Sequence, residues 1–257
     1  MHTTLLGTAG WMPSPQRETA CISVRLGKSL ILLDAGTGLR RLVTDPYLIS
    51  GVESIHVLLS HFHLDHVVGL SYLSALPGDR PVHIAGPGSW LYGTSTRDIL
   101  ADFIRPPYQP YRLADKGFHI EELGPTIADI DGLGIHVRAQ FLHSAPSVGF
   151  RLGDSLAYLT DTAFDQESQE FASGVTVLIH EAFSDNPGDR THSSASEAAS
   201  VAAAAGVEYL YLVHIAPWAD ESTLLENARS NFPSALIGQD GDRLTIPRGL
   251  HGGPRRS

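Results

Sequence analysis

Short apolar runs separated by turn residues are the main pattern in the first quarter of the chain. Residues 4–6, 20–26 and 30–33 are rich in aliphatic side chains, and a Gly-Lys-Ser segment separates the last two runs. We therefore expect strands here, two of them joined by a hairpin turn. The run at 55–59 is also mainly apolar, which is typical of a strand buried within a sheet.

The rest of the chain combines helix-like and strand-like segments. Helices are predicted where apolar residues recur at helical spacing, at residues 65–75, 89–104, 194–205 and 223–231. Further strands are predicted at residues 82–85, 134–142, 148–152, 156–159, 175–179, 209–213, 235–237 and 243–246. Interspersed strands and helices, without a linker or a repeat, predict a layered α/β fold. We expect one domain over residues 1–250 and a flexible C-terminal tail over residues 251–257.

Two segments have a clear local reading. The alanine-rich helix at 194–205 follows Ser193 and Ser194, either of which suits an N-cap, and precedes Gly206, which suits a C-cap. Residues 105–111 contain three prolines, which lack amide donors, so we expect an irregular loop. That loop either connects two elements or borders a substrate pocket.

The composition is globular with an acidic balance. There are 18 Lys and Arg against 28 Asp and Glu, a formal net charge of -10, and the one short basic run is at residues 254–256. Because an acidic protein repels phosphate backbones, we expect no nucleic-acid partner. No stretch reaches the roughly 18 apolar residues that span a membrane, and no signal segment is visible, so we expect a cytoplasmic protein without a membrane partner. The single cysteine, Cys21, is expected to be a buried thiol.

Histidine is unusually frequent, with 13 in 257 residues, and neutral imidazole is a common metal ligand. Three histidines and one aspartate fall within six positions, directly after the run at 55–59. In an extended loop alternate residues point the same way, so His61 and His63 can bind one metal ion. Asp65 and His66 lie on the first helical turn that follows and can face a second ion, because a helix N-terminus favours a carboxylate.

Three further candidate ligands each follow a predicted strand. His143 comes after residues 134–142, Asp161 after 156–159, and His214 after 209–213. A single histidine after a strand is usually an ordinary residue. Three such residues in a chain with the 61–66 motif instead predict a metal centre completed from several strand ends.

Together, these motifs resemble the metallo-β-lactamase superfamily along nearly the whole chain, in particular its ribonuclease Z-like phosphodiesterases. The small-molecule cyclic phosphodiesterases of that branch match comparably well. The resemblance rests on the 61–66 motif and on Leu-Gly-Thr at 6–8, Leu-Asp-Ala-Gly at 33–36, His-Ser-Ala-Pro-Ser-Val-Gly-Phe at 143–150, Leu-Thr-Asp-Thr at 159–162, Ile-His-Glu-Ala at 179–182, His-Ser-Ser at 192–194 and Leu-Val-His at 212–214. It implies a four-layer αββα sandwich with two metal ions at one edge, between the sheets.

The resemblance also implies which residues bind these ions. One ion would be held by His61, His63 and His143, the other by Asp65, His66 and His214, and Asp161 would bridge them. Zinc suits these nitrogen and carboxylate ligands, and manganese or iron remain compatible with them.

Three more positions take roles from the same resemblance. His192 corresponds to a catalytic histidine of the phosphodiesterases. Glu181 either orients His192 or belongs to a local polar network. Asp34 corresponds to an aspartate that supports the metal loop by hydrogen bonds and is not itself a ligand.

These inferences favour a hydrolase in which two zinc ions convert a bridging water into the attacking hydroxide. Asp65 and Asp161 would orient this nucleophile and could accept its proton. The tRNA-processing enzymes of this branch usually carry a long arm before the bridging aspartate, whereas here a tight hairpin at 153–155 lies between His143 and Asp161. We therefore expect a phosphodiesterase that acts on a small molecule such as a cyclic phosphate, with Arg105 or Arg112 as candidate phosphate contacts.

Other readings of the same ligands stay open. The main alternative is hydrolysis of a carboxylic ester, lactone, thioester or amide, for which His192 would matter less. Iron-dependent redox chemistry and metal binding without turnover are further alternatives. Homodimers are common in the resembled superfamily, so a homodimer is compatible with the sequence.

Overall fold

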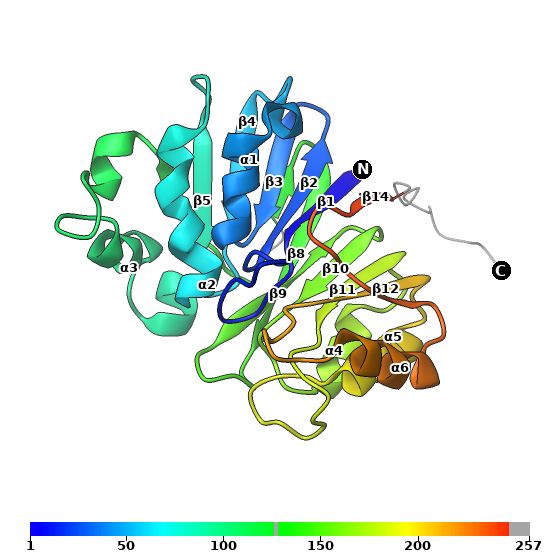
Figure 1. Cartoon of the computed structure of the whole chain (residues 1–257). Helices are drawn as coiled ribbons and strands as arrows, with labels where there is room; N and C mark the ends of the chain where they lie inside the picture. Colours follow the sequence, from blue (N-terminus) through cyan, green and yellow to red (C-terminus); the bar gives the residue numbers. More distant parts are fainter. Residues whose placement is uncertain (126–127, 247–257) are drawn as a thin grey trace.

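The computed structural model describes residues 1–125 and 128–246, and in it two β-sheets pack face to face between two layers of helices (Figure 1). This arrangement is the predicted four-layer αββα sandwich. Helices α1 to α3 cover the outer face of one sheet, and α4 to α6 cover the outer face of the other (Figure 1). The predicted tail at 251–257 lies outside the described residues.

The first sheet has seven strands in the order β14-β1-β2-β3-β4-β5-β6. In chain order these are β1 (His2–Gly7), β2 (Cys21–Leu26), β3 (Ser29–Leu33), β4 (Ser54–Leu58), β5 (Val82–Gly86), β6 (His119–Glu122) and β14 (Arg243–Thr245). Strands β1, β2 and β3 run antiparallel, whereas β3, β4, β5 and β6 run parallel.

The second sheet has seven strands in the order β13-β12-β11-β10-β9-β8-β7. In chain order these are β7 (Ala128–Ile130), β8 (Leu133–Gln140), β9 (Ser147–Leu152), β10 (Leu156–Leu159), β11 (Val177–Glu181), β12 (Tyr209–Val213) and β13 (Ala235–Ile237). Strands β10 to β13 are parallel. Because parallel strands end at the same edge of a sheet, the loops after them meet there.

The helices of the described residues are α1 (Arg40–Thr44), α2 (Leu64–Val67), α3 (Thr96–Phe103), α4 (Gln166–Phe171), α5 (Ala195–Ala205) and α6 (Glu221–Asn231). Short 3₁₀ segments are η1 (Thr37–Leu39), η2 (Pro46–Ile49), η3 (Val68–Ala75) and η5 (Leu113–Lys116), and η4 (Gly88–Tyr92) is a π-helix. None of the helices in these residues has the length and apolar character that a bilayer span requires.

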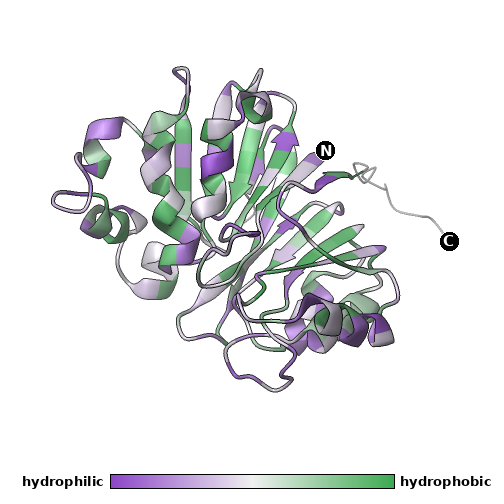
Figure 2. Cartoon of the chain, viewed as in Figure 1, coloured by the Kyte–Doolittle hydropathy of each residue, from purple (hydrophilic) through white to green (hydrophobic). Residues whose placement is uncertain are grey.

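Three hydrophobic layers hold the sandwich together. One lies between the sheets, and one lies between each sheet and its helices. Strand β3 shows the pattern: Ile31 and Leu33 face the other sheet, while Leu30 and Leu32 face the helices. All four are buried, and a fully buried side chain of this size contributes roughly 1.5–3 kcal/mol. Figure 2 shows the same contrast, with apolar strands inside and polar residues on the outer helices.

Local capping explains why α5 begins and ends where it does. Ser194 accepts a hydrogen bond from the Glu197 amide, and the Glu197 carboxylate accepts one from the Ser194 amide in return. Gly206 ends the helix with φ 66°. The alanines of α5 are small, so the helix lies close to the second sheet. The predicted helix at 194–205 and the burial of Cys21 are both confirmed.

Two predicted helices differ from the structure. The helix expected at 65–75 is the single turn α2 followed by the 3₁₀ segment η3. The helix expected at 89–104 is divided into η4 and α3, because Gly93 has φ 66° and Ser95 starts a new helix by accepting from the Asp98 amide. Strands β6 and β7 and helices α1 and α4 were not predicted, since each is short and carries little hydrophobic periodicity.

Candidate metal centre

All seven predicted ligands lie at one edge of the sandwich, where strands of both sheets end. The loop and first turn after β4 carry four of them, and the segments after β8, β10 and β12 carry one each. Within each of two groups, every ligand atom lies within 4.8 Å of the others. The groups are His61, His63, His143 and Asp161, and Asp65, His66 and His214.

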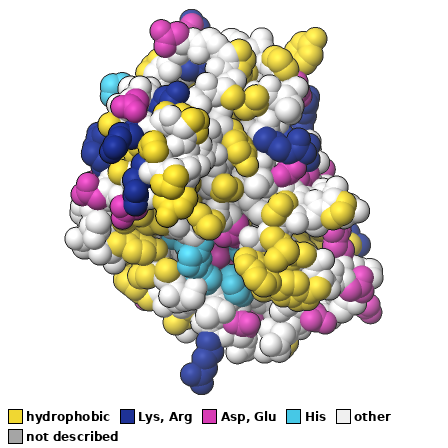
Figure 3. Space-filling model, turned by 60° about the vertical axis from the view of Figure 1, so that its left-hand side comes forward, with side chains coloured by type: hydrophobic (Ala, Val, Ile, Leu, Met, Phe, Trp, Pro, Cys, Tyr) yellow, Lys and Arg dark blue, Asp and Glu magenta, His cyan; other side chains and the backbone are white. Residues whose placement is uncertain are grey.

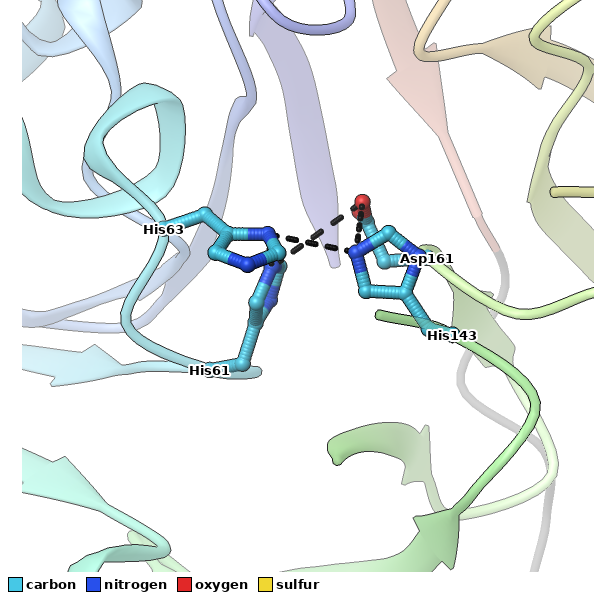
Figure 4. A group of neighbouring side chains, drawn as sticks. All are labelled: His61, His63, His143 and Asp161. Carbon is cyan, nitrogen blue, oxygen red and sulfur yellow. Dashed lines mark hydrogen bonds and ion pairs between the residues drawn. The ribbon is translucent and has the colours of Figure 1, made fainter. Parts of the chain in front are cut away.

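In the first group three imidazole nitrogens and one carboxylate oxygen point toward one another (Figure 4). His63 Nδ1 lies 2.8 Å from His61 Nε2 and 3.2 Å from His143 Nε2. Asp161 Oδ1 lies 3.4 Å from His143 Nε2 and 3.9 Å from His61 Nε2. Ligands about 2.0–2.1 Å from a tetrahedral zinc ion stand roughly 3.3 Å apart, so these separations fit such an ion.

The second group converges on the other oxygen of Asp161. Asp161 Oδ2 lies 3.1 Å from His66 Nε2 and 3.4 Å from His214 Nε2. The two imidazole nitrogens are 3.3 Å apart, and Asp65 Oδ2 is 3.4 Å from each of them. Asp161 therefore presents one carboxylate oxygen to each group, which is the geometry that a bridging ligand requires.

A buried network beneath the ligands decides which imidazole nitrogens are free. Asp34 accepts hydrogen bonds from the Ser60 hydroxyl at 2.9 Å, from His66 Nδ1 at 2.9 Å and from the Tyr158 hydroxyl at 3.0 Å. Because the Ser60 hydroxyl donates to Asp34, it accepts from His61 Nδ1, which is 2.9 Å away. In the neutral form of each of these histidines the proton therefore lies on Nδ1, and Nε2, which faces the centre, is the nitrogen that can bind a metal ion.

The remaining histidines are oriented by other partners. His143 Nδ1 donates to the Thr191 carbonyl at 2.8 Å. His214 Nδ1 is buried, has no hydrogen-bond partner among the described residues, and faces Glu181 Oε2 at 3.7 Å. Gly10 packs directly against it, because a Cβ at that position would lie 2.7 Å from His214 Nδ1. The ring of His214 is thus held by close packing as much as by hydrogen bonding.

Glu181 makes the direct contact with His192 that the sequence left open. His192 Nδ1 donates to Glu181 Oε2 at 2.7 Å, and the other carboxylate oxygen accepts from the Thr162 amide at 2.5 Å. Burial alone would lower the pKa of His192, but the hydrogen bond to Glu181 raises it above its ordinary value. His192 also forms a close group with Asp161 and His214. Its second nitrogen is therefore available beside the candidate ligands.

Charged neighbours set the direction of the pKa shift at three of the candidate ligands. Burial would raise the pKa of Asp161, but His214 and His66 hold it well below its usual range. Burial would lower the pKa of His214, but Asp161 above all raises it to about 10. Against burial, Asp161 and Asp65 also raise the pKa of His66. A cation that binds between these groups displaces protons, so its affinity rises with pH.

The backbone is turned unusually at this edge. Trp11, Asp34, Asp161 and His214 have φ values of 65°, 61°, 51° and 54°. Among the other described residues that are not glycine, Asp131 alone shares a positive φ. A left-handed residue with a side chain costs about 1–3 kcal/mol. The concentration of such residues here indicates that packing energy is used to make the strand ends converge.

Comparison with known proteins places this geometry in a family. Residues 30–215, most of the chain, match the sequence profile of the Beta-lactamase superfamily domain. The chain belongs to the beta-lactamase superfamily. The metallo-beta-lactamase fold protein YhfI from Bacillus subtilis has the same fold, with a TM-score of 0.77, 19% identity and coverage of 95% of this chain and 99% of that one. The short form of human tRNase Z aligns with a TM-score of 0.72 and 22% identity over 96% of this chain and 100% of that one.

A superfamily relative also corrects one prediction. Ribonuclease Z of Gloeothece citriformis is 29% identical, over 96% of this chain and 97% of the relative. The expectation of a small-molecule substrate with no nucleic-acid partner is therefore wrong, since a relative that matches along its whole length is a ribonuclease. The net charge of -10 misled because it is a property of the whole chain, whereas binding depends on the local field. The alignment runs over 317 positions, so the relative also has insertions that this chain of 257 residues lacks.

Membership of the beta-lactamase superfamily makes this chain a hydrolase and implies that it binds divalent metal ions. The His and Asp groups described above can hold such ions.

Over these groups lies a cavity of about 310 Å³. Three aromatic residues that were not predicted also line it: Trp11, Phe183 and Trp218. None of residues 105–112 lines this cavity, and Arg105 instead lies over the Tyr108 ring. In the sequence, Trp11 and Trp218 come shortly after the motifs that contain Gly7 and His214. This proximity is the one sequence feature that could have indicated that they lie near the site.

Proposed function

We propose that this protein is a phosphodiesterase that uses two zinc ions. The single observation that carries the proposal is the position of His192. Its Nδ1 is held by the buried Glu181, and its ring lies beside both Asp161 and His214. A group that can donate a hydrogen bond next to a two-ion centre suits a substrate whose transition state carries negative charge on several oxygens, as a phosphodiester does.

We assign the seven clustered residues as the ligands. His61, His63 and His143 would hold one ion, Asp65, His66 and His214 would hold the other, and Asp161 would contribute to both. The donor set favours zinc, and metal analysis of the purified protein distinguishes zinc from manganese and iron. When bound, two such ions lower the pKa of water and stabilise negative charge on a phosphoryl group.

The residues of the chain perform the remaining tasks. Asp65 and Asp161 orient the attacking water, and Asp65 accepts its proton. His192, held at Nδ1 by Glu181, donates from Nε2 to the oxygen on which charge develops, either of the phosphoryl group or of the leaving group. Asp34 and Ser60 keep His61 and His66 in the tautomer that leaves Nε2 free.

For the substrate we propose a nucleotide phosphodiester, RNA included. The support is the resemblance to relatives named ribonuclease Z together with the His192–Glu181 pair. Strands β9 and β10 are joined by a short turn that places Gly153 at φ 53°, so no long arm is inserted between His143 and Asp161. Shorter RNA ends and dinucleotides therefore belong in the first substrate panel beside precursor tRNA.

His192→Ala tests the proposal. We expect turnover of bis(p-nitrophenyl) phosphate to fall by about 10²–10⁴-fold, the usual contribution of a positioned acid or base. Both metal ions should stay bound, as counted by elemental analysis. His136→Ala, which changes an exposed histidine of β8, is the matched control and should leave turnover unchanged. Loss of metal from His192→Ala, or hydrolysis of p-nitrophenyl acetate without hydrolysis of the phosphodiester, would contradict the assignment.

A further inference from the structure

Three aromatic side chains form one side of the cavity above the candidate ligands. We call Trp11, Phe183 and Trp218 the aromatic wall. The Trp11 and Trp218 rings are 5.5 Å apart at 82°, and the Trp218 and Phe183 rings are 5.8 Å apart at 90°. Phe183 in turn stacks on His192 at 4.2 Å and 16°. The wall therefore reaches from the surface down to His192.

The two indoles are exposed although they are large and apolar. Trp11 is 59% exposed and Trp218 is 61% exposed. Burial of a large apolar side chain stabilises a fold, and these positions forgo most of that gain. In Figure 3 histidine and acidic side chains lie in a hollow bordered by hydrophobic side chains. Exposed aromatic surface in a cavity is the usual mark of a ligand-binding surface.

Backbone contacts hold the wall at a constant position relative to the candidate ligands. The Trp11 amide donates to Asp65 Oδ2 at 2.8 Å, and Trp11 has φ 65°. The Ala216 amide donates to the Phe183 carbonyl at 3.0 Å, and the Ala219 amide closes the turn around Trp218 by donating to the Ala216 carbonyl at 3.0 Å. A substrate bound above the candidate metal ligands thus meets indoles that are already in place, which lowers the entropic cost of contact.

The rest of the cavity lining restricts what the wall can recognise. Besides the aromatic wall, the lining consists of candidate metal ligands, His192 and Ser144. No arginine or lysine is among these residues, so the cavity offers no guanidinium or ammonium group for a second phosphate or a carboxylate. Binding energy for the organic part of a substrate must come from contact with flat aromatic surfaces. A planar ring gains most from such surfaces, because it stacks on one ring and meets the edge of the next.

We propose that the aromatic wall stacks with the nucleobase next to the scissile phosphate. The inference rests on the proposed phosphodiesterase activity and assigns recognition of the base to these three side chains, so that they favour a nucleotide ester over an aliphatic or sugar ester of phosphate. Stacking on an aromatic side chain tolerates every base, because each base has a π-face. The wall therefore selects for the presence of a base and discriminates little among the four.

A matched series of three phosphodiesters tests this preference. Each substrate is a p-nitrophenyl phosphodiester with p-nitrophenol as the leaving group. The second esterified group is the 5′-oxygen of thymidine, n-hexanol or methanol. We expect the thymidine ester to have the highest kcat/KM. Trp218→Ala and Trp11→Ala should lower the thymidine-to-methyl ratio by about tenfold, since stacking contributes ~1–3 kcal/mol per base. Trp218→Phe should retain part of the ratio. Tyr47→Ala, which removes an exposed ring outside this cavity, should change nothing.

A binding measurement separates this inference from the proposed function. The chain has three tryptophans, so in a Trp90→Phe background all tryptophan emission comes from the two wall indoles. With zinc added, adenosine 5′-monophosphate should quench the emission and ribose 5-phosphate should not. Four outcomes would overturn the inference. Three are kinetic: equal kcat/KM for all three esters, a hexyl ester as good as the thymidine ester, or equal losses on all three in Trp218→Ala. The fourth is equal quenching by both phosphates. Absence of any phosphodiester hydrolysis with selective quenching would overturn the proposed function alone.

Discussion

Two groups of histidines in the same molecule differ in almost every physical respect. The first is the ligand cluster at the strand ends. The second, which we call the histidine stack, consists of His56, His83 and His119, which are register partners on the neighbouring strands β4, β5 and β6. Their rings lie parallel, 4.9 Å and 4.7 Å apart at 9° and 18°. The stack presents ring faces to ring faces, whereas the cluster turns ring nitrogens toward common points.

The contrast shows what a metal centre needs besides histidine. Adjacent positions on parallel strands place side chains side by side, so the stack cannot converge on one point. Convergence requires residues beyond the strand ends, where the backbone turns through positive φ, as it does at Asp161 and His214. It also requires carboxylates beneath the rings, and Asp34 and Asp161 supply them. Among the described residues the stack histidines belong to none of the groups able to hold an ion.

The electrostatic environments of the two groups overlap in part, because burial lowers the pKa of His61 and His63 in the cluster as it lowers that of His56 in the stack. In the cluster, carboxylates overcome burial and raise the pKa of His66 and His214. In the stack, burial followed by the neighbouring His83 lowers the pKa of His56, and Asp131 and Glu121 offset this in part. The part of the cluster around His66 and His214 thus favours positive charge, whereas the surroundings of His56 disfavour it.

The largest expected effect comes from Asp161→Ala, which removes the carboxylate shared by both halves of the cluster. Partners that merely orient a ligand contribute 10–100-fold to metal affinity, so loss of a shared ligand should exceed about a hundredfold. Elemental analysis should find both ions depleted and turnover of bis(p-nitrophenyl) phosphate abolished. Two ions still bound at full occupancy would show that Asp161 does not bridge them.

Asp34→Asn should have the next largest effect. The amide keeps the shape of the side chain, but its NH₂ group would face the Ser60 and His66 donors that the carboxylate now accepts from. We expect metal affinity to fall by about 10–100-fold, measured by competition with a chelator. Asp131→Asn is the matched control, because Asp131 also has a positive φ and also accepts from a serine, Ser29. An equal effect in both variants would mean that the Asp34 network is not specific to the metal centre.

The smallest expected effect is the contribution of His56, in the histidine stack, to the pH dependence of folding stability. The folded chain lowers the pKa of His56, so the unfolded chain takes up a proton below about pH 6.5 that the folded chain resists. Stability should therefore fall as the pH drops from about 7 to 5. His56→Gln should reduce this fall by less than about 1 kcal/mol, because water screens a half-exposed charge.

Chemical denaturation of chelator-treated protein at the two pH values measures this difference. His136→Gln, at an exposed position on β8, is the control substitution. If His56→Gln lost stability more steeply with falling pH than the unaltered chain, His56 would stabilise the fold at low pH, which is the opposite of what we expect.

Sequence reasoning located the cluster because each candidate ligand follows an apolar run. The 61–66 motif and the positions of His143, Asp161 and His214 were readable from local pattern alone. The helix predicted at 89–104 was wrong because Gly93 allows a left-handed turn that hydrophobic spacing does not reveal. The histidine stack was invisible, since its register depends on which strands become neighbours.

The sequence by itself determined the kinds of ligand, their order along the chain and the layered fold, because strand burial and turn chemistry depend on residues a few positions apart. Only the tertiary structure decided which donors share a point. His66 and His214 are 148 positions apart in the chain, yet their Nε2 atoms lie 3.3 Å apart. The aromatic wall was decided in the same way, because Trp11 and Trp218 meet only when β1 and β12 belong to sheets that face each other. Such contacts follow from how the two sheets pack, and no local stretch of sequence specifies that packing.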